Sequence, residues 1–254
     1  MDEARSKTAD SLADNRLLAT LDAATRGALA PLFERVPMAV RATVYEDRQP
    51  FEHAYFPVDG VLSMIAVVEG APDSMIEVAT VGNEGMVGLP IFLGAEVTPG
   101  RAFAQVPGES LRIGAADLRG ALARHPELGR VLHRYTQSLL VQVSQSTGCN
   151  RVHAPATRCA RWILMTDDRV AGPTFDLTQE FLGQMLGERR PAVNEAASAL
   201  QRDGLIRYVR GRMTVVDRPG LERAACGCYR IIRDEYARML SDLASAAKPE
   251  ADSA

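Results

Sequence analysis

The sequence predicts an α+β protein in which an antiparallel β-roll, a long helix and a winged helix-turn-helix follow one another. Three observations carry this prediction. Short β-rich runs fill residues 36–113, an apolar stripe at helical spacing extends from Pro126 to about Cys149, and two short helices precede a hairpin within Leu177 to Asp217. The chain is divided accordingly into residues 1–124 (N-terminal helices and roll), 125–150 (long helix), 151–218 (winged helix-turn-helix) and 219–254 (helical extension and tail).

The N-terminal part is predicted to be a helical cover followed by the strands of the roll. Apolar residues recur at helical spacing from Asn15 to Phe33, and Asp22 can cap the second of two short helices. Turn dipeptides such as Asp59-Gly60 and Pro107-Gly108 punctuate the next segment and indicate antiparallel connections. The strands are expected at Ala39 to Tyr45, His53 to Phe56, Val61 to Val68, Met75 to Val81, Arg101 to Val106 and Ser110 to Ile113.

The helices after the roll are predicted from end signals and apolar spacing. A short helix at Ala115 to Leu122 ends before His125-Pro126, and Pro126 suits the first turn of the long helix. An apolar stripe of this kind fits a helix that packs on its own core as well as one that pairs with a second chain. The stripe consists of Leu128, Val131 or Leu132, Tyr135, Leu139, and Gln142 or Val143. Further helices are expected at Thr157 to Thr166 and Leu221 to Ala246.

The composition is that of a globular protein with unevenly distributed charge. Of the 254 residues, 46% are hydrophobic, and the net charge of −3 excludes a chain that is basic throughout. Residues 1–150 carry a net charge of −5 and residues 151–254 a net charge of +2. Arginine supplies 27 of the 29 basic residues. Because arginine outnumbers lysine in the acidic half as well as in the basic half, this bias indicates a GC-rich coding sequence more than a binding function.

The N-terminus and the cysteines indicate a cytoplasmic protein. Residues 1–14 are polar and lack the apolar core of a secretory signal. The longest apolar run, Val61 to Val68, is far too short to span a bilayer. Four cysteines are too few for the disulfide framework of a small secreted domain. We therefore expect no export and no association with a membrane.

Residues 177–206 carry the most specific local signals. Thr178 can cap a first helix, and Gly187 supplies the left-handed turn after it. Pro191 suits the first turn of a second helix, and Gly204 ends that helix. Two helices joined by so tight a corner indicate a helix-turn-helix.

The second helix has a polar face that suits the major groove of DNA, and that face begins at Arg190. A hairpin with Arg210-Gly211-Arg212 at its turn follows it, as a β-wing would. Six arginines against three acidic residues gather between Gly187 and Arg212 and favour DNA binding over the general alternative, a helical hairpin with a solvated face. The residues expected at the DNA are Thr178, Gln179, Arg189, Arg190, Asn194, Glu195, Ser198, Arg202, Arg210 and Arg212.

Within this set, Arg190 and Asn194 are expected to read base edges, since arginine favours guanine and asparagine favours adenine. Arg210 and Arg212, at the tip of the wing, are expected to bind the DNA backbone.

Further motifs lie outside the helix-turn-helix: Tyr55-Phe56-Pro57, Gly82 to Gly88, Cys149-Asn150 with His153, Arg161-Trp162, and Cys226 to Tyr229. Together with residues 177–206 they resemble the Crp/Fnr family of transcription factors over nearly the whole chain. The resemblance implies a roll of the cyclic-nucleotide-binding kind and a homodimer formed through the long helix. It also implies contact with RNA polymerase and a palindromic DNA operator with half-sites about 34 Å apart.

The roll departs from the cyclic-nucleotide-binding members of that family. Those members hold the ribose with the Glu of a Gly-Glu-Leu turn and the cyclic phosphate with a later Arg, whereas this chain has Gly85-Met86-Val87 and then Arg101-Ala102. Since Met86 lacks the carboxylate that would accept the ribose hydrogen bond, we expect little effect of cyclic AMP. An effector, if one binds, is expected at Gly85, Met86, Arg101, Ala102 and Ser144. The alternative is a constitutive DNA-binding dimer whose roll is only structural.

Metal, redox and enzymatic functions are not predicted. The iron–sulfur members of the family use N-terminal cysteines, and this chain has none before Cys149. Zinc at Cys226, Cys228 and His153 is disfavoured, because residues two apart on a helix point in different directions, so helix packing is expected for these cysteines. A lone His53 does not indicate haem. A metal enzyme built on the roll would need clustered histidines, and the four histidines are scattered.

Overall fold

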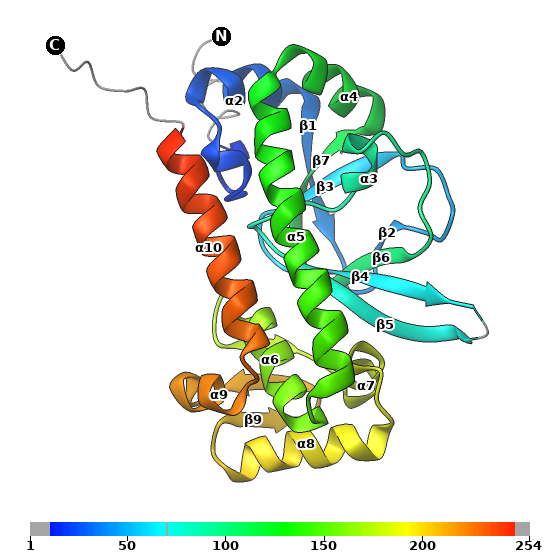
Figure 1. Ribbon diagram of the computed structural model, residues 1–254, viewed down its shortest axis with the longest axis vertical. Helices are drawn as coiled ribbons and strands as arrows, with labels where there is room; N and C mark the ends of the chain where they lie inside the picture. Colours follow the sequence, from blue (N-terminus) through cyan, green and yellow to red (C-terminus); the bar gives the residue numbers. More distant parts are fainter. Residues whose placement is uncertain (1–10, 70, 247–254) are drawn as a thin grey trace, which may run out of the picture.

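The computed structural model describes residues 11–69 and 71–246. A long helix, α5 (Pro126–Val152), runs through most of the molecule, with a β-roll on one side and helix α10 (Cys228–Ala246) lying along it (Figure 1). A helical unit at the lower end in that view contains the helix-turn-helix. The predicted α+β architecture is thus confirmed. Among the helices of the described residues, none is long and apolar enough to cross a lipid bilayer.

The roll consists of two antiparallel sheets. One has the order β1-β7-β3, with β1 at Phe33–Met38, β7 at Gly108–Gly114 and β3 at His53–Pro57. The other has the order β2-β6-β4-β5, with β2 at Thr43–Tyr45, β6 at Arg101–Val106, β4 at Val61–Val68 and β5 at Ala71–Val81. Both sheets bury apolar side chains, and the main core continues from the roll into the helices.

Two predictions in this region were wrong. The apolar spacing from Asn15 to Phe33 predicts a helix that includes Phe33, but this residue begins β1, where it pairs with Ile113. The strand predicted at Ala39 to Tyr45 is shorter, because Arg41 adopts a positive φ of 65° in a turn and only Thr43–Tyr45 remains extended. Tertiary pairing and a left-handed turn residue therefore override the local pattern.

Short helices cover the N-terminal side of the roll. They are η1 (Leu18–Thr20), α2 (Ala23–Leu29), η2 (Ala30–Leu32), α3 (Leu89–Phe92) and α4 (Ala115–Arg124). The cap predicted at Asp22 is confirmed, since its carboxylate accepts a hydrogen bond of 2.8 Å from the backbone N–H of Thr25.

The apolar stripe of α5 is buried within the chain itself. Its members face the roll or α10, and the hydroxyl of Tyr135 donates to the backbone oxygen of Met86 over 2.8 Å. Nε2 of Gln142 donates to the oxygen of Thr80 over 2.9 Å. A pairing surface for a second chain, if α5 provides one, must therefore lie on another face of the helix.

The C-terminal unit starts with α6 (Pro155–Asp167). It continues through β8 (Thr174–Asp176), α7 (Gln179–Leu186), α8 (Arg190–Arg202), β9 (Ile206–Val209), β10 (Arg212–Val215) and α9 (Arg218–Ala224). The wing is a three-stranded sheet in the order β8-β10-β9, and β8 was not predicted. The single helix expected from Leu221 to Ala246 is wrong, because Ala225 is extended (ψ 154°) and separates α9 from α10.

Candidate nucleic-acid interface

The corner of the helix-turn-helix is fixed by local hydrogen bonds. Oγ1 of Thr178 accepts from the N–H of Phe181 over 3.1 Å and caps α7. Gly187 adopts the left-handed conformation (φ 61°) after α7, and the N–H of Glu188 donates to the oxygen of Gly183 over 3.0 Å. The cap and the C-terminal glycine predicted from the sequence are therefore confirmed.

Helix α8 divides into a packed side and an exposed side. Val193, Ala196, Ala197 and Leu200 are buried and α8 packs on α6. The predicted DNA-contacting residues that are exposed on or next to this helix are Arg189, Arg190, Glu195, Ser198 and Arg202. Asn194 is only half-buried, and its Oδ1 is shielded from solvent with no hydrogen-bond partner among the described residues.

A buried arginine, which was not among the predicted site residues, holds the corner in place. Arg158 of α6 is 4% exposed, donates to Oε1 of Glu188 over 2.7 Å and also donates to the backbone oxygen of Leu186. These bonds satisfy the free carbonyl at the end of α7 and fix the start of the turn. Such a contact joins residues 28 to 30 positions apart, so no local pattern reveals it.

The wing is fastened to the start of α7. Arg210 (φ 51°) and Gly211 (φ 78°) both have positive φ, as a two-residue hairpin turn of type I′ requires. The N–H of Leu177 donates to the oxygen of Gly211 over 2.7 Å, and the hydroxyl of Tyr208 donates to the oxygen of Leu177 over 2.8 Å. The tip of the wing therefore has a fixed position relative to the two helices.

The start of α7, the start of α8 and the tip of the wing border an open groove of about 480 Å³. Four predicted DNA-contacting residues line it, namely Thr178, Gln179, Arg190 and Arg210, together with Tyr208 and Gly211. Backbone and hydroxyl donors at the start of α7 thus lie beside two exposed guanidinium groups. Phosphate oxygens and guanine edges accept hydrogen bonds from donors of these kinds. Tyr208 was not among the predicted residues, although an aromatic residue two positions before the turn of the wing is a signal that the sequence offers.

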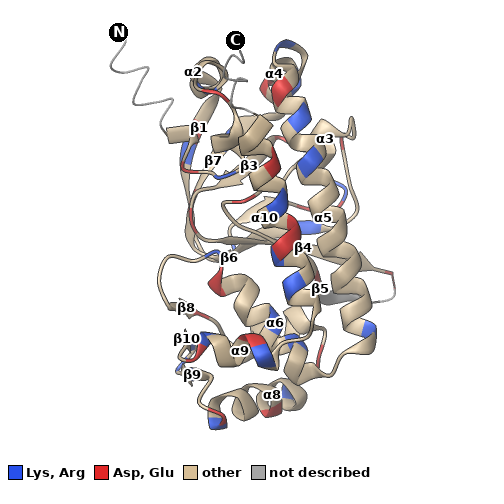
Figure 2. Cartoon of the chain, turned by 60° about the vertical axis from the view of Figure 1, so that its left-hand side comes forward, with Lys and Arg blue, Asp and Glu red and all other residues tan. Residues whose placement is uncertain are grey.

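Other predicted residues lie away from this groove. Arg212 lines a second groove of about 490 Å³ on the wing, with Arg207, Arg210 and Thr214 among its neighbours, and its Nε is 3.6 Å from Asp176 Oδ1. Arg202 lies at the C-terminal end of α8. Figure 2 shows basic residues at the wing and on α8 at the end of the molecule opposite α2 and α4.

The residues expected to form an effector site lie in different environments. Met86 is fully buried in the main core, whereas Ala102 is buried in a second apolar cluster within the roll. Ser144 is exposed on α5, and Arg101 is half-buried on β6. A side-chain Cβ at Gly85 would meet the ring of Tyr135 at 2.5 Å, so α5 fills the space next to the turn where the resembling family places its ribose contact.

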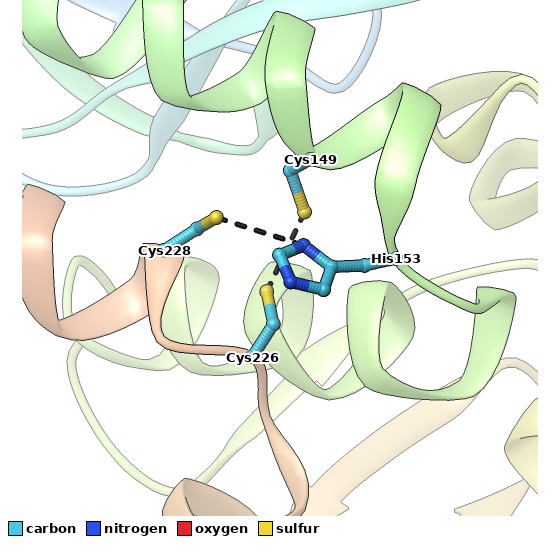
Figure 3. A group of neighbouring side chains, drawn as sticks. All are labelled: Cys149, His153, Cys226 and Cys228. Carbon is cyan, nitrogen blue, oxygen red and sulfur yellow. Dashed lines mark hydrogen bonds between the residues drawn. The ribbon is translucent and has the colours of Figure 1, made fainter.

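A separate group of potential metal ligands lies where α5 ends and α10 begins (Figure 3). It comprises Cys149, His153, Cys226 and Cys228, whose ligand atoms all lie within 4.8 Å of one another. Zinc was disfavoured on the premise that Cys226 and Cys228 lie on one helix. That premise was wrong, because Cys226 precedes α10 in the non-helical link after Ala225.

Two of these thiols interact directly. The Sγ atoms of Cys149 and Cys226 are 3.4 Å apart. The hydrogen bond from Cys149 lowers the pKa of the Cys226 thiol below its ordinary value, and the charge of Arg161 acts in the same direction, whereas burial opposes it. Cys226 is therefore the cysteine of this group that most readily becomes a thiolate.

The comparisons with known proteins agree with the geometry. Residues 157–224 match the family model of the Crp-like helix-turn-helix domain. FixK2 from Bradyrhizobium japonicum is similar in structure at 18% sequence identity, with a TM-score of 0.63 over 77% of this chain and 98% of FixK2. A CRP-family transcriptional regulator from Thermus thermophilus is 20% identical, with a TM-score of 0.59 over 76% of this chain and 96% of its own.

A third similar structure is the c-di-GMP responsive global regulator CLP from Xanthomonas campestris, at 17% identity and a TM-score of 0.59 over 76% of this chain and 99% of CLP. No curated protein sequence matches the chain. Residues 157–224 are therefore a Crp-like helix-turn-helix domain, and the chain as a whole has the fold of the Crp/Fnr transcription regulators that its sequence resembles.

Proposed function

We propose that this protein is a homodimeric transcription regulator that binds a palindromic DNA operator through α8 and the wing. The observation that carries the proposal is the groove in which Arg190 at the start of α8 and Arg210 at the wing tip face the same space as the capped start of α7. Arg190 is assigned to base edges in the major groove, and Arg210 to a phosphate alongside it. Since its partner is chromosomal DNA, the proposal places the protein in the cytoplasm.

The experiment that tests these roles compares Arg190→Ala and Arg210→Ala on a duplex selected from a random library by the wild-type protein. Loss of the Arg190 base contact should cost about 1–3 kcal/mol on the selected site and relax preference at one position. Loss of the Arg210 phosphate contact should weaken binding to all duplexes alike and lower the salt slope by about 1. Arg119→Ala, on α4 at the other end of the molecule, is the matched control. Equal losses on selected and random DNA for both variants would contradict the assigned roles.

The homodimer is proposed to form through the face of α5 that the chain itself leaves exposed. That face repeats at alternating steps of four and three residues, the spacing at which two parallel helices pack. It consists of His133, Gln137, Leu140, Ser144, Thr147 and Arg151. Leu140, in the middle of the row, is 57% exposed, which is a large exposed fraction for an apolar side chain.

The test of the dimer is Leu140→Asp, measured by sedimentation equilibrium. A charge at the centre of a helix pair should shift the protein to monomers and abolish tight binding to a two-half-site operator, while a single half-site is still bound weakly. Val152→Asp, which changes a residue that is 76% exposed just outside the row, should leave the dimer intact. A wild-type protein that sediments as a monomer at micromolar concentration would refute the proposal.

The roll is proposed not to bind cyclic AMP in the manner of the cyclic-nucleotide-binding relatives. Met86 is completely buried, Tyr135 occupies the space beside Gly85, and the neighbouring carboxylate of Glu84 is buried against Arg169, so the ribose would find neither a free carboxylate nor room. Calorimetry with cyclic AMP should give no measurable heat. Tight binding that is lost in Arg101→Ala would overturn this part of the proposal and leave DNA binding untouched.

A structural roll in a constitutive dimer remains the second candidate function. The observation that favours it is the burial of both Met86 and Ala102 in apolar clusters. The regulated and constitutive forms differ in one measurement, since a constitutive dimer has the same operator affinity in cell extract and in pure buffer.

A further inference from the structure

We propose that Cys149, His153, Cys226 and Cys228 form a structural Zn²⁺ site that joins the end of α5 to the start of α10. The four residues come from three separate places in the chain: the last turn of α5, the residue directly after it, and the link and first turn that begin α10. In Figure 3 all four side chains point toward one another. Three cysteines and one histidine are one of the common ligand sets of closed, structural zinc sites.

The distances fit a single ion. Zinc bonds of about 2.3 Å to sulfur and about 2.0 Å to nitrogen, in tetrahedral geometry, place neighbouring ligand atoms roughly 3.5–3.8 Å apart. The Sγ atoms of Cys149 and Cys226 are 3.4 Å apart, and Sγ of Cys228 is 3.7 Å from Nδ1 of His153. No pair of these ligand atoms exceeds 4.8 Å. An iron–sulfur cluster spreads its four protein ligands over two or more iron atoms and so separates some of them by more than the 4.8 Å found here, which favours one metal ion.

The surroundings of the four ligands suit a buried metal thiolate. Cys149, Cys226 and Cys228 are 1%, 8% and 7% exposed and form an apolar cluster of their own, separate from the main core. Zinc with three thiolates and a neutral imidazole has a net charge of −1. Arg161, a buried arginine on α6 whose charge acts on the cluster, can balance it.

The site would control the junction between the roll and the DNA-binding unit. His153 and Ala154, both extended, are the two residues between α5 and α6. A zinc ion bound to His153 would fix one side of this junction to α10, which lies along α5. We therefore infer that the metal holds the orientation of the helix-turn-helix relative to α5, and that its loss leaves the fold of each part intact but lowers operator affinity.

Metal content is the direct test. The full-length protein, purified without chelator or metal-affinity resin, should contain one zinc ion per chain by elemental mass spectrometry. Binding releases the thiol protons to solvent as Zn²⁺ takes their place. Metal-free protein titrated with Co²⁺ should develop the thiolate-to-cobalt charge-transfer and ligand-field bands of a tetrahedral site, and Zn²⁺ should displace Co²⁺.

Single substitutions identify the ligands. Loss of a residue that only hydrogen-bonds a metal ligand costs roughly 10–100-fold in metal affinity. Loss of a ligand itself should cost more, so we expect a larger decrease in Zn²⁺ affinity for each of Cys149→Ala, Cys226→Ala and Cys228→Ala. Cys159→Ala is the matched control, because Cys159 is also fully buried but lies in the main core on α6, outside the cluster. His153→Ala should keep the three thiolates yet change the cobalt spectrum. Circular dichroism checks that each variant is folded.

The results that overturn the proposal are equally direct. A reduced, folded wild-type protein that holds no zinc and gives no cobalt bands refutes it, as does a Cys159→Ala variant that loses metal as Cys149→Ala does. Iron with sulfide, or a Cys149–Cys226 disulfide in protein isolated without air, would assign the cluster a redox role in place of zinc. None of these measurements uses DNA, so they fail or succeed independently of the proposed operator binding.

Discussion

Replacing Glu77 by glutamine tests how the roll is joined to the DNA-binding unit. Glu77 lies on β5 and is buried, and its Oε1 accepts a hydrogen bond of 2.8 Å from Nε1 of Trp162 on α6. Its Oε2 is 2.7 Å from the hydroxyl of Ser63, and that hydroxyl is also 2.6 Å from Oε1 of Gln105. The Nε2 of Gln105 continues the network to Thr166 of α6 over 3.1 Å.

A proton on Glu77 satisfies this network. With the amide oxygen of Gln105 toward Ser63, the single hydroxyl hydrogen of Ser63 cannot be donated to both acceptors at once. If Glu77 is protonated, it donates to Ser63, and Ser63 donates to Gln105, so every contact is satisfied. Burial raises the pKa of Glu77 to about 7, although the bonds from Ser63 and Trp162 and the charges of Arg161 and Arg169 act to lower it.

The magnitude follows from this pKa. In the unfolded chain this carboxyl group loses its proton near pH 4.5, and in the folded chain near pH 7. Between these two pH values the folded chain therefore binds about one proton more than the unfolded chain does. A rise of the pKa from 4.5 to about 7 corresponds to a preference of about 3 kcal/mol for the protonated form. The Glu77 contribution to the free energy of unfolding is therefore present below pH 4.5, and about 2.5 kcal/mol of it is lost as the pH rises from 5 to 8.

Glutamine mimics the protonated acid, because it can accept from Trp162 and donate to Ser63. Glu77→Gln should match the wild type at pH 5 and exceed it by about 2.5 kcal/mol at pH 8. Urea unfolding, followed by the fluorescence of Trp162, the single tryptophan of the chain, measures the difference directly. Glu52→Gln, at an exposed carboxylate, is the control. A Glu77→Gln variant that is less stable than the wild type at pH 8 would show that an ionised Glu77 is held by the nearby arginines and would refute the reasoning.

Two further predictions concern stability. Gly85→Ala places a Cβ 2.5 Å from the buried ring of Tyr135 and should lower the free energy of unfolding by about 1–3 kcal/mol, whereas Gly27→Ala, in a helix with open space around it, should raise it by about 0.5–1 kcal/mol. Equal effects in urea unfolding would contradict the packing argument. Thr178→Val removes the acceptor for the Phe181 N–H and should cost about 1 kcal/mol, and a variant as stable as the wild type in thermal unfolding would show that the cap contributes nothing.

The features that the sequence predicted correctly depend on short-range chemistry. Three of these features each need a particular residue type at a particular backbone conformation, so a few neighbouring positions are enough to predict them. They are the cap at Thr178, the left-handed Gly187 and the turn at Arg210-Gly211. The long helix and most strands of the roll follow from apolar periodicity for the same reason.

Errors arose where distant partners determine the local structure. Phe33 belongs to a strand because Ile113 pairs with it, and β8 forms because β10 lies beside it. The stripe on α5 has the spacing of a dimer seam, yet the roll and α10 bury it, so periodicity indicated an apolar contact without indicating which partner supplies it.

The sequence by itself therefore determined the α+β class, the helix-turn-helix with its wing and four of the six residues that line the groove, since these depend on local conformation and on a recognisable pattern. Only the tertiary structure decided which face of α5 stays exposed, that Glu77 contacts Trp162, and that Cys149 and His153 meet Cys226 and Cys228. The physical reason is the same in each case. The partners are far apart in the sequence: 49 and 62 positions for the bonds that bury the inner face of α5, 85 for Glu77 and Trp162, and 77 for Cys149 and Cys226. Cys226 also lies in the non-helical link before α10 begins at Cys228, and no local pattern indicated that link.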